Sequence, residues 1–457
     1  MVTRKLRVIT GFFGIVCVLS AADFGQIAGK CALNDLLLAE RPNGANGEKS
    51  GQQDLEDDND QPATSFSNDI DFNPVDVLSE VSKIVATNFY DQHFNHDSWA
   101  RNVRDCELKI ASVKTRDEFA LQINALLATL NTSHTYYFAK SNPKRYQILG
   151  IFQHLAGPDF ETTVIYDGIG IDTRLVGKEY YITSVFDGLA AAKAGLQFGD
   201  EILSVDGQPF HPLDSFIGKC EKTVEVNVRR GGETKSFSVP VERLDGRSMF
   251  STALEASKQV FDRNGKKIAY VHAWSYAGQH YHESIRQTVL FGDFSQCDAL
   301  VLDLRDGWGG ADLNYLNLFR PPIAEIKSTP RTGPPLNFSG VWGKPVALLI
   351  NGGTTSGKEL FAYGFRKMRL GTIVGEKSAG AVVAGSCFLL TNGDVLYVAV
   401  SDVEVDGVRL EGVGVAPDLY VPRSLPVEPQ SKNQLFDAVT SIDPQLEAAF
   451  DLLSERK

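Results

Sequence analysis

Two runs of almost uninterrupted apolar residues constrain the fold of this chain more than any other feature: ALVLDL at residues 299–304 and PVALLI at residues 345–350. A strand with one face in water alternates apolar and polar residues, so runs without that alternation indicate strands that are covered on both faces. A further apolar run lies at residues 267–274, and helical patterns follow at residues 279–291 and directly after Ser356. Strands of this kind interleaved with helices are typical of a mostly parallel sheet, so we expect an α/β fold.

The rest of the chain divides into segments of different character. Its 457 residues are too many for one compact core and predict two to four units. Three helical patterns lie within 75–130, whereas short β-rich runs alternate with glycine-containing turns from residue 160. The predicted division is a signal peptide at 1–22, a flexible spacer at 23–73, a helical domain at 74–145, a mainly β domain at 160–245, and the α/β core with a final helix at 250–457.

The first 22 residues have the features of a secretory signal. Three basic residues precede an apolar run at residues 8–19, and small residues end at Ala22, after which we expect cleavage. This run is shorter than the roughly 20 residues that a membrane-spanning helix needs. We therefore predict an exported protein, periplasmic or secreted, with no stable membrane span after cleavage; an uncleaved anchor is the alternative.

Charge and cysteine content exclude several classes of partner and of site. The chain has 45 Lys and Arg against 57 Asp and Glu, a formal net charge of −12, which argues against nucleic acid as a partner. Of its six cysteines, Cys17 lies in the signal, and the others are too far apart in the sequence to form a CxxC pair. Because we recognise no cluster of metal ligands, we predict no metal and no cofactor.

The segment NGGTTSGKE at residues 351–359 is the sharpest local feature. It follows an apolar strand and opens a helix, so its serine, Ser356, exposes a hydroxyl beside the amides of the first helical turn. This geometry suits a nucleophile whose oxyanion is stabilised by backbone N–H groups. From this segment alone, the alternative is that Thr354, Thr355 and Ser356 only cap the helix.

The same segment contains the pattern GxxxxGK, from Gly352 to Lys358, with which phosphate-binding loops open. Glu359 follows at the position where Ser or Thr must bind magnesium, and a carboxylate there repels phosphate. We therefore disfavour nucleotide binding.

Two further segments are candidates for the same site. One of the eight histidines, His134, stands in the polar loop NTSHTYY at 131–137, which could aim its imidazole, although a lone histidine is more often structural. The segment DLRDGWGG at 303–310 follows a buried strand, where loops commonly form the binding crevice and glycines let the backbone approach a ligand. A simple tight turn is the alternative for this loop.

Taken together and in order, these segments resemble the C-terminal processing (tail-specific) family of serine peptidases over residues 74–453. LNTSHTYYF, DLRDGWGG, TTSGKELFA, IVGEKSAG and EGVGVAPD are similar to the peptidase motifs of that family, and GIGI with AAAKAGLQFGDEILSVDGQPF resembles its PDZ domain. The resemblance implies a crotonase-like core of βα spiral units, an inserted PDZ domain and a helical N-terminal unit. It also implies hydrolysis of peptide bonds through an acyl-enzyme.

Carried over residue by residue, the resemblance places Ser356 at the nucleophile position. It implies that Gly357, with Gly309 or Gly310, donates backbone N–H groups to the oxyanion. Many members use a lysine 25 residues after the serine, but this chain has Ala381 there, and its methyl group cannot accept a proton.

The branch of the family that includes tricorn and the chlamydial secreted protease uses a histidine and a glutamate instead. The matching residues are His134, with Ser133 beside it in support, and Glu411, which precedes the terminal signature. The resemblance therefore favours a catalytic triad of Ser356, His134 and Glu411, in which His134 takes the serine proton and Glu411 orients the imidazole.

In the PDZ domain, the resemblance assigns peptide binding to Gly168, Ile169, Gly170 and Ile171, where a peptide's C-terminus is added as a strand. This domain would bind substrate or regulate access to the site, and the expected partners are proteins or peptides. A homodimer is a further expectation. Two alternatives stay open: a non-catalytic ligand- or peptide-binding protein on the same fold, and a degenerate peptidase that serves as a scaffold.

Overall fold

The computed structural model describes residues 68–152, 164–324, 326–333, 335–423, 425 and 443–455, with the backbone only at 336–338. The predicted signal peptide and residues 23–67 of the predicted spacer lie outside this part of the chain. Within the described residues, no helix has the length and apolar character that crossing a membrane requires.

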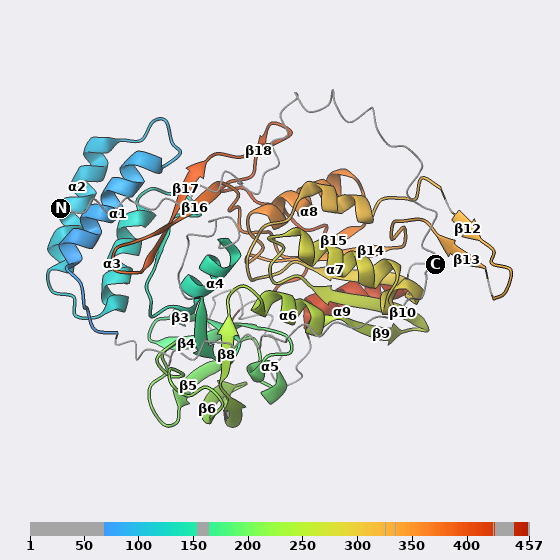
Figure 1. Cartoon of the computed structure of the whole chain (residues 1–457), viewed down its shortest axis with the longest axis horizontal. Coiled ribbons are helices and arrows are strands. Elements are labelled where there is room, and N and C mark those ends of the chain that lie inside the picture. Colours follow the sequence, from blue (N-terminus) through green and yellow to red (C-terminus); the bar gives the residue numbers. More distant parts are fainter. Residues whose placement is uncertain are drawn as a thin grey trace, which may run out of the picture.

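Three helices begin the described chain and pack together (Figure 1): α1 Pro74–Asn88, α2 His96–Ile110 and α3 Arg116–Ala128. Each starts at a side chain that accepts a backbone N–H: Asn73 and Asn95 cap α1 and α2, and Thr115 begins a capping box on α3. Their inward faces share one apolar core, to which Val81 and Ile123 belong. The helical N-terminal unit expected from the sequence is confirmed.

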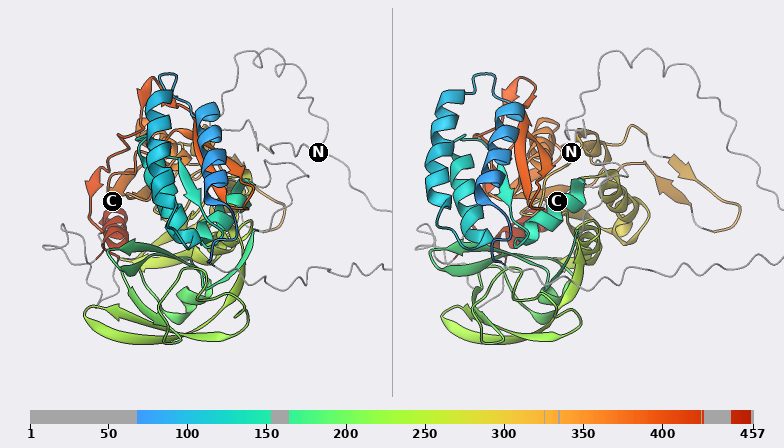
Figure 2. Two further views of the ribbon diagram at one scale, coloured as in Figure 1. Left: turned by 90° about the vertical axis from the view of Figure 1, so that its left-hand side faces the viewer. Right: turned by 60° about the vertical axis from the view of Figure 1, so that its left-hand side comes forward.

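A three-stranded sheet joins distant parts of the chain beside these helices. Its antiparallel strands are β1 Tyr136–Phe138, β17 Val395–Ser401 and β16 Ala384–Leu389, in the order β1-β17-β16. Tyr137, Phe388 and Leu396 are buried in the same core as the three helices, and Figures 1 and 2 show β16 and β17 lying beside them. The division drawn from the sequence did not foresee that residues 384–401 complete the helical unit.

A mainly β unit lies below the helices in Figure 1, and helix α4 Pro143–Phe152 leads into it. Its elements are β2 Ile165–Gly168, β3 Ile171–Val176, β4 Glu179–Val185, α5 Ala190–Ala194, β5 Glu201–Val205, β6 Thr223–Arg230, β7 Glu233–Pro240 and β8 Glu242–Asp245. Strands β3 to β7 form one antiparallel sheet in sequence order, and β2 pairs with β8. Among the described strands, β3 has a partner on one side only, so it is an edge strand.

The α/β core is built on a six-stranded sheet in the order β20-β15-β14-β11-β10-β9. Its strands are β9 Gln259–Arg263, β10 Lys266–His272, β11 Ala299–Asp303, β14 Val346–Ile350, β15 Thr372–Gly375 and β20 Leu419–Tyr420. All neighbouring pairs are parallel except β9 with β10. The predicted α/β fold with a mostly parallel sheet is confirmed.

Helices cover both faces of this sheet, which explains the uninterrupted apolar runs. They are α6 Met249–Ser257, α7 Gln279–Leu290, α8 Gly357–Lys367 and α9 Pro444–Glu455, with the 3-10 helices η3 Asp293–Gln296 and η4 Leu313–Leu318. Leu300 and Leu348 pack with α6, α7 and α8, whereas their neighbours Val301 and Leu349 pack with α9. Successive strand residues point to opposite faces, so both sets are buried.

Two small hairpins complete the described elements: β12 Ile326–Ser328 with β13 Leu336–Phe338, and β18 Glu404–Val405 with β19 Val408–Arg409. Figure 1 shows the first of them projecting away from the core, on the side opposite to the helical unit.

Candidate active site

Ser356 lies in the tight turn between β14 and α8. Its backbone has φ 57° and ψ −131°, a strained conformation that costs about 1–3 kcal/mol. The residue occupies the N-cap position of α8, but its side chain caps no amide, so the alternative in which Ser356 only caps the helix is wrong. The turn instead places Ser356 at the wall of a cavity of about 370 Å³.

Glu359 fixes residues 378–381, the segment that supports the turn at Ser356. Its buried carboxylate accepts the N–H groups of Gly380 and Ala381, both at 2.7 Å, and the hydroxyl of Ser378 at 2.6 Å. The carbonyl of Ala381 in turn accepts the N–H of Ser356 at 2.7 Å. Burial raises the pKa of Glu359, and these hydrogen bonds oppose the rise.

The glycine loop that follows β11 lies against the first turn of α8. A Cβ on Gly309 would stand 2.5 Å from the Cβ of Ser356, and a Cβ on Gly357 would stand 2.5 Å from the nitrogen of Ala311, so the close approach requires glycine. Within the described part of the chain, the N–H groups of Gly309 and Gly310 donate to no protein acceptor. Both residues line the cavity beside Ser356, so the structure brings the three predicted oxyanion glycines together at the serine.

His134 reaches the same cavity from the N-terminal part of the chain. It lies just before β1 with φ 51°, and only 8% of its surface is exposed. The ring packs against that of Tyr397 on β17, with centroids 5.5 Å apart. The structure describes no hydrogen bond between His134 and Ser356, although both line this cavity. Burial lowers the pKa of His134 to about 4, against the charge of Glu411, so the imidazole is neutral at pH 7.

The hydroxyl of Ser133 lies between His134 and Glu411. Its Oγ is 2.8 Å from Nδ1 of His134 and 2.9 Å from Oε2 of Glu411. An ionised carboxylate only accepts hydrogen bonds, so Ser133 donates to Glu411 and accepts the Nδ1–H of His134. This tautomer leaves Nε2 as the ring atom that can accept a proton. Glu411, which we expected to orient the imidazole, thus reaches His134 through the hydroxyl of Ser133.

Backbone amides fix the position of the Glu411 carboxylate. It accepts the N–H of Ser133 at 2.8 Å, of Val382 at 2.7 Å and of Val383 at 3.2 Å. Burial raises the pKa of Glu411, but these hydrogen bonds outweigh burial, and the pKa lies below its ordinary value. Glu411 therefore stays ionised and can stabilise an imidazolium through Ser133.

The remainder of the cavity is mostly apolar. Aromatic and aliphatic side chains from β1, α4, β17 and the glycine loop line it: Tyr136, Phe138, Ile151, Phe152, Trp308 and Tyr397. Sequence reasoning missed α4 and β17 as parts of the site, because they are far from Ser356 in the chain. The apolar run VLYVAVS at 395–401 was a usable signal for a buried strand, but nothing in the sequence indicates which sheet it joins.

Neither neighbouring lysine occupies the place of a catalytic base. Lys377 is exposed, and the ammonium of Lys358 is buried and donates to the carbonyl oxygens of Trp274 and Asp306. Lys358 is therefore also unable to bind phosphate, which removes support for the nucleotide alternative. Among the described residues, no group of three His, Cys, Asp or Glu side chains could hold a metal ion.

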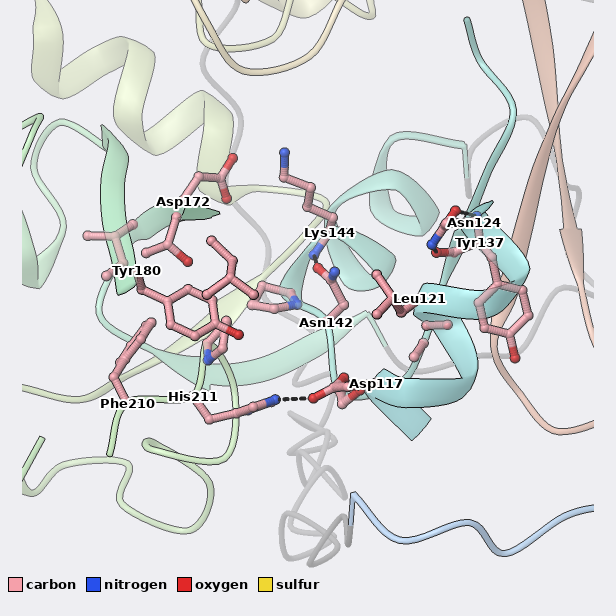
Figure 3. Close-up of a pocket in the computed structure, with 18 residues that line it drawn as sticks. Asp117, Leu121, Asn124, Tyr137, Asn142, Lys144, Asp172, Tyr180, Phe210 and His211 are labelled. Carbon is pink, nitrogen blue, oxygen red and sulfur yellow. Dashed lines mark hydrogen bonds and ion pairs between the residues drawn. The ribbon is translucent and has the colours of Figure 1, made fainter. Parts of the chain in front are cut away.

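The four residues assigned to peptide binding span the turn from β2 to β3. Gly168 ends β2, Ile171 begins β3, and Ile169 between them is buried with 1% exposure. Ile171 lines a second cavity, of about 300 Å³, between β3, residues 210–212 and α3 (Figure 3), whereas the other three do not.

An ion pair joins two of the residues that line this second cavity. Nε2 of His211 lies 2.6 Å from Oδ2 of Asp117 on α3, as Figure 3 shows. The β unit and the helical unit are thus joined directly beside the edge strand β3.

Comparisons with known proteins agree with this architecture. Residues 267–421 match the model of peptidase family S41, and residues 168–241 match that of the PDZ domain. A carboxyl-terminal-processing protease of Synechocystis sp. is 26% identical over 391 residues, which cover 83% of this chain and 86% of the relative. Carboxyl-terminal-processing peptidase 2, chloroplastic, of Arabidopsis thaliana is 25% identical and covers 78% of this chain and 70% of its own length.

Matches to a larger peptidase are partial. The tricorn protease of Thermoplasma volcanium is 26% identical over 270 residues, which cover 56% of this chain and 24% of the relative. Among solved structures, the tricorn protease aligns at a TM-score of 0.49 with 19% identity, covering 84% of this chain and 36% of its own. The photosystem II D1 C-terminal processing protease aligns at a TM-score of 0.47 with 20% identity, covering 84% of this chain and 98% of its own.

Proposed function

Because the chain is a serine-type peptidase with a family S41 domain at residues 267–421 and a PDZ domain at residues 168–241, we propose that it is an exported endopeptidase that forms an acyl-enzyme on Ser356. The observation that carries this proposal is the bridged network of His134, Ser133 and Glu411, which ends at the cavity of Ser356. Together with Ser356, these residues supply the nucleophile, the base and the carboxylate that nucleophilic catalysis needs.

In the proposed mechanism, the Ser356 oxygen attacks the carbonyl carbon of the scissile bond, and Nε2 of His134 takes the serine proton. The imidazolium then donates this proton to the leaving amine, and a water molecule deprotonated by His134 hydrolyses the acyl-enzyme. Glu411 stabilises the imidazolium through Ser133. The N–H groups of Gly357 and of Gly309 or Gly310 stabilise the oxyanion of each tetrahedral intermediate.

The lining of the cavity supports a preference for substrates with an apolar side chain next to the scissile bond. Phe138, Phe152 and Trp308 offer an apolar surface beside Ser356, and burying a large apolar side chain there gains roughly 1.5–3 kcal/mol. The edge strand β3 and its cavity support binding of a peptide segment by the PDZ domain, as an added strand. Export and a homodimer stay predictions from the sequence.

Hydrolysis kinetics test the proposal. We expect purified protein to cleave casein or an internally quenched peptide with apolar residues around the scissile bond. Ser356→Ala and His134→Ala should each lower kcat by roughly 10⁴- to 10⁶-fold, because the members of such a unit act together. Activity that is equal in wild type and Ser356→Ala would contradict the proposal, and absence of hydrolysis in all forms would favour the non-catalytic binding protein.

A further inference from the structure

Lys358 is a fully buried cation that the proposed mechanism does not use. It is the second residue of α8, two positions after Ser356, and 0% of its surface is exposed. Its Nζ donates to the carbonyl oxygen of Asp306 at 2.9 Å and to that of Trp274 at 3.1 Å. Among the described residues, no carboxylate forms an ion pair with it. Because a buried ammonium is costly to desolvate, its presence beside the nucleophile needs a physical reason.

The two carbonyl groups belong to the loops that form one side of the site. Asp306 begins the glycine loop after β11, and Trp274 follows β10. The Trp274 carbonyl also accepts the N–H of Trp308 at 2.7 Å, and a Cβ on Gly307 would stand 2.0 Å from the same oxygen. The ammonium therefore ties α8 to both loops at the point where the glycine loop turns.

Displacement of either loop would also move the groups that take part in the reaction. Gly309 lies against Ser356, and its carbonyl accepts the N–H of Tyr276 from the loop after β10 at 3.1 Å. The amides of Gly309 and Gly310 are thus placed by contacts to α8 and to this loop together. A catalytic oxyanion site depends on donors that are fixed before charge develops, so these contacts affect the rate.

We propose that Lys358 is a positioning residue for peptide hydrolysis, whose ammonium fixes the two loops that hold the oxyanion amides against Ser356. This inference rests on the proposed function, because it assigns a role within that mechanism. Lys358 does not line the cavity beside Ser356, so it acts through the loops and makes no contact with the substrate.

The surroundings of Lys358 make its hydrogen bonds to the two loops dependent on pH. Burial lowers the pKa of Lys358 to about 7, against the charges of Asp303 and Asp306, which raise it. An ammonium N–H donates a stronger hydrogen bond than an amine N–H. The hydrogen bonds from Lys358 to the two loops therefore weaken as pH rises through about 7. The two charges that act on it are the carboxylates of Asp303, which ends β11 and pairs with Arg305, and of Asp306, which pairs with Arg423 after β20.

The test compares substrate turnover with affinity for a peptide boronic acid, a transition-state analogue that bonds to the serine. We expect Lys358→Met to lower kcat and analogue affinity by about 10- to 100-fold at pH 6 while the substrate KM stays unchanged. Wild-type activity should fall as pH rises above about 7, and this fall should be absent in Lys358→Met. Lys358→Arg keeps a permanent charge and should also lose this pH dependence. Lys377→Met removes an exposed lysine near the same turn and should behave like wild type.

Unchanged kcat and analogue affinity in Lys358→Met, or a fall above pH 7 that persists in it, would overturn the inference. If circular dichroism shows that neither Lys358 variant folds, the pH dependence of wild-type activity decides. Activity that stays constant between pH 6 and 9 overturns the inference, and a fall in activity as pH rises through about 7 supports it. The proposed function fails separately, because an inactive wild type contradicts that function, whereas Ser356-dependent activity that is indifferent to Lys358 contradicts this inference alone.

Discussion

At the scale of single residues, the hydroxyl of Ser133 determines which nitrogen of His134 can act as a base. It donates to Glu411, so it must accept from Nδ1–H, and Nε2 is left without a proton. The family resemblance in the sequence points to these three residues, but it gives no sign that Ser133 stands between the other two. That arrangement follows from the amides of Val382 and Val383, which hold Glu411 in place.

We expect Ser133→Ala to lower kcat by about 10²-fold, because Nδ1–H loses its acceptor and the imidazole loses its fixed tautomer. KM should change little, since Ser133 does not line the cavity beside Ser356. Steady-state kinetics with a peptide substrate measure both values, and Ser401→Ala on the exposed end of β17 serves as the control. A wild-type kcat in Ser133→Ala would mean that Glu411 acts on His134 without this bridge.

The pH dependence of kcat/KM tests the environment of His134. Burial disfavours the imidazolium and lowers its pKa to about 4, so the base stays neutral down to that pH. We expect kcat/KM to be constant between pH 5 and 6 and to fall tenfold per unit below about 4, as the free enzyme becomes protonated. An acid limb near the ordinary histidine value of about 6.5 would show that the ring is solvated.

At the scale of elements, the site is formed where the loops after β10, β11 and β14 meet the start of α8. The apolar strands and the nucleophile turn could be predicted, because burial on both faces and the position of Ser356 before a helix are visible in the sequence. Pairing of β1 with β17 could not, since a strand of three residues carries almost no pattern and its partner lies more than 250 positions away. The cavity wall contributed by α4 was missed because this helix lies far from Ser356 in the chain.

The glycine loop gives a prediction about close packing. Gly309→Ala places a Cβ 2.5 Å from that of Ser356, so the loop must move and the oxyanion amides with it. We expect kcat to fall by about 10²-fold or more, as it does when an oxyanion donor is lost. Gly352→Ala is the matched control, because a Cβ there meets nothing within 4 Å. Equal loss in the two variants would point to a general effect on folding.

At the scale of the whole molecule, distant segments converge on one site, and the PDZ unit is joined to the helical unit beside its own edge strand. His211 and Asp117 form that junction. Their residue types could be read from the sequence, but their pairing depends on how the two units are placed, and no local pattern encodes that placement. Figure 3 shows the pair among the residues that line the cavity along β3.

This junction should make stability depend on pH. The carboxylate of Asp117 raises the pKa of His211 despite the opposing effect of burial. The charged pair therefore contributes fully below the unfolded value of about 6.5 and is lost as pH rises through the raised pKa. We expect the melting temperature of His211→Gln to lie below that of wild type at pH 6 and to approach it by pH 9. A difference that does not change with pH would contradict an ionic contribution.

Fluorophosphonate labelling of purified protein, located by peptide mass spectrometry, tests the assignment of the nucleophile and its base most directly. We expect one adduct, on Ser356, in wild type. His134→Ala should form the same adduct at least 10²-fold more slowly, because the serine hydroxyl has lost its base. Labelling that persists in Ser356→Ala, or that proceeds in His134→Ala at the wild-type rate, would contradict the assignment.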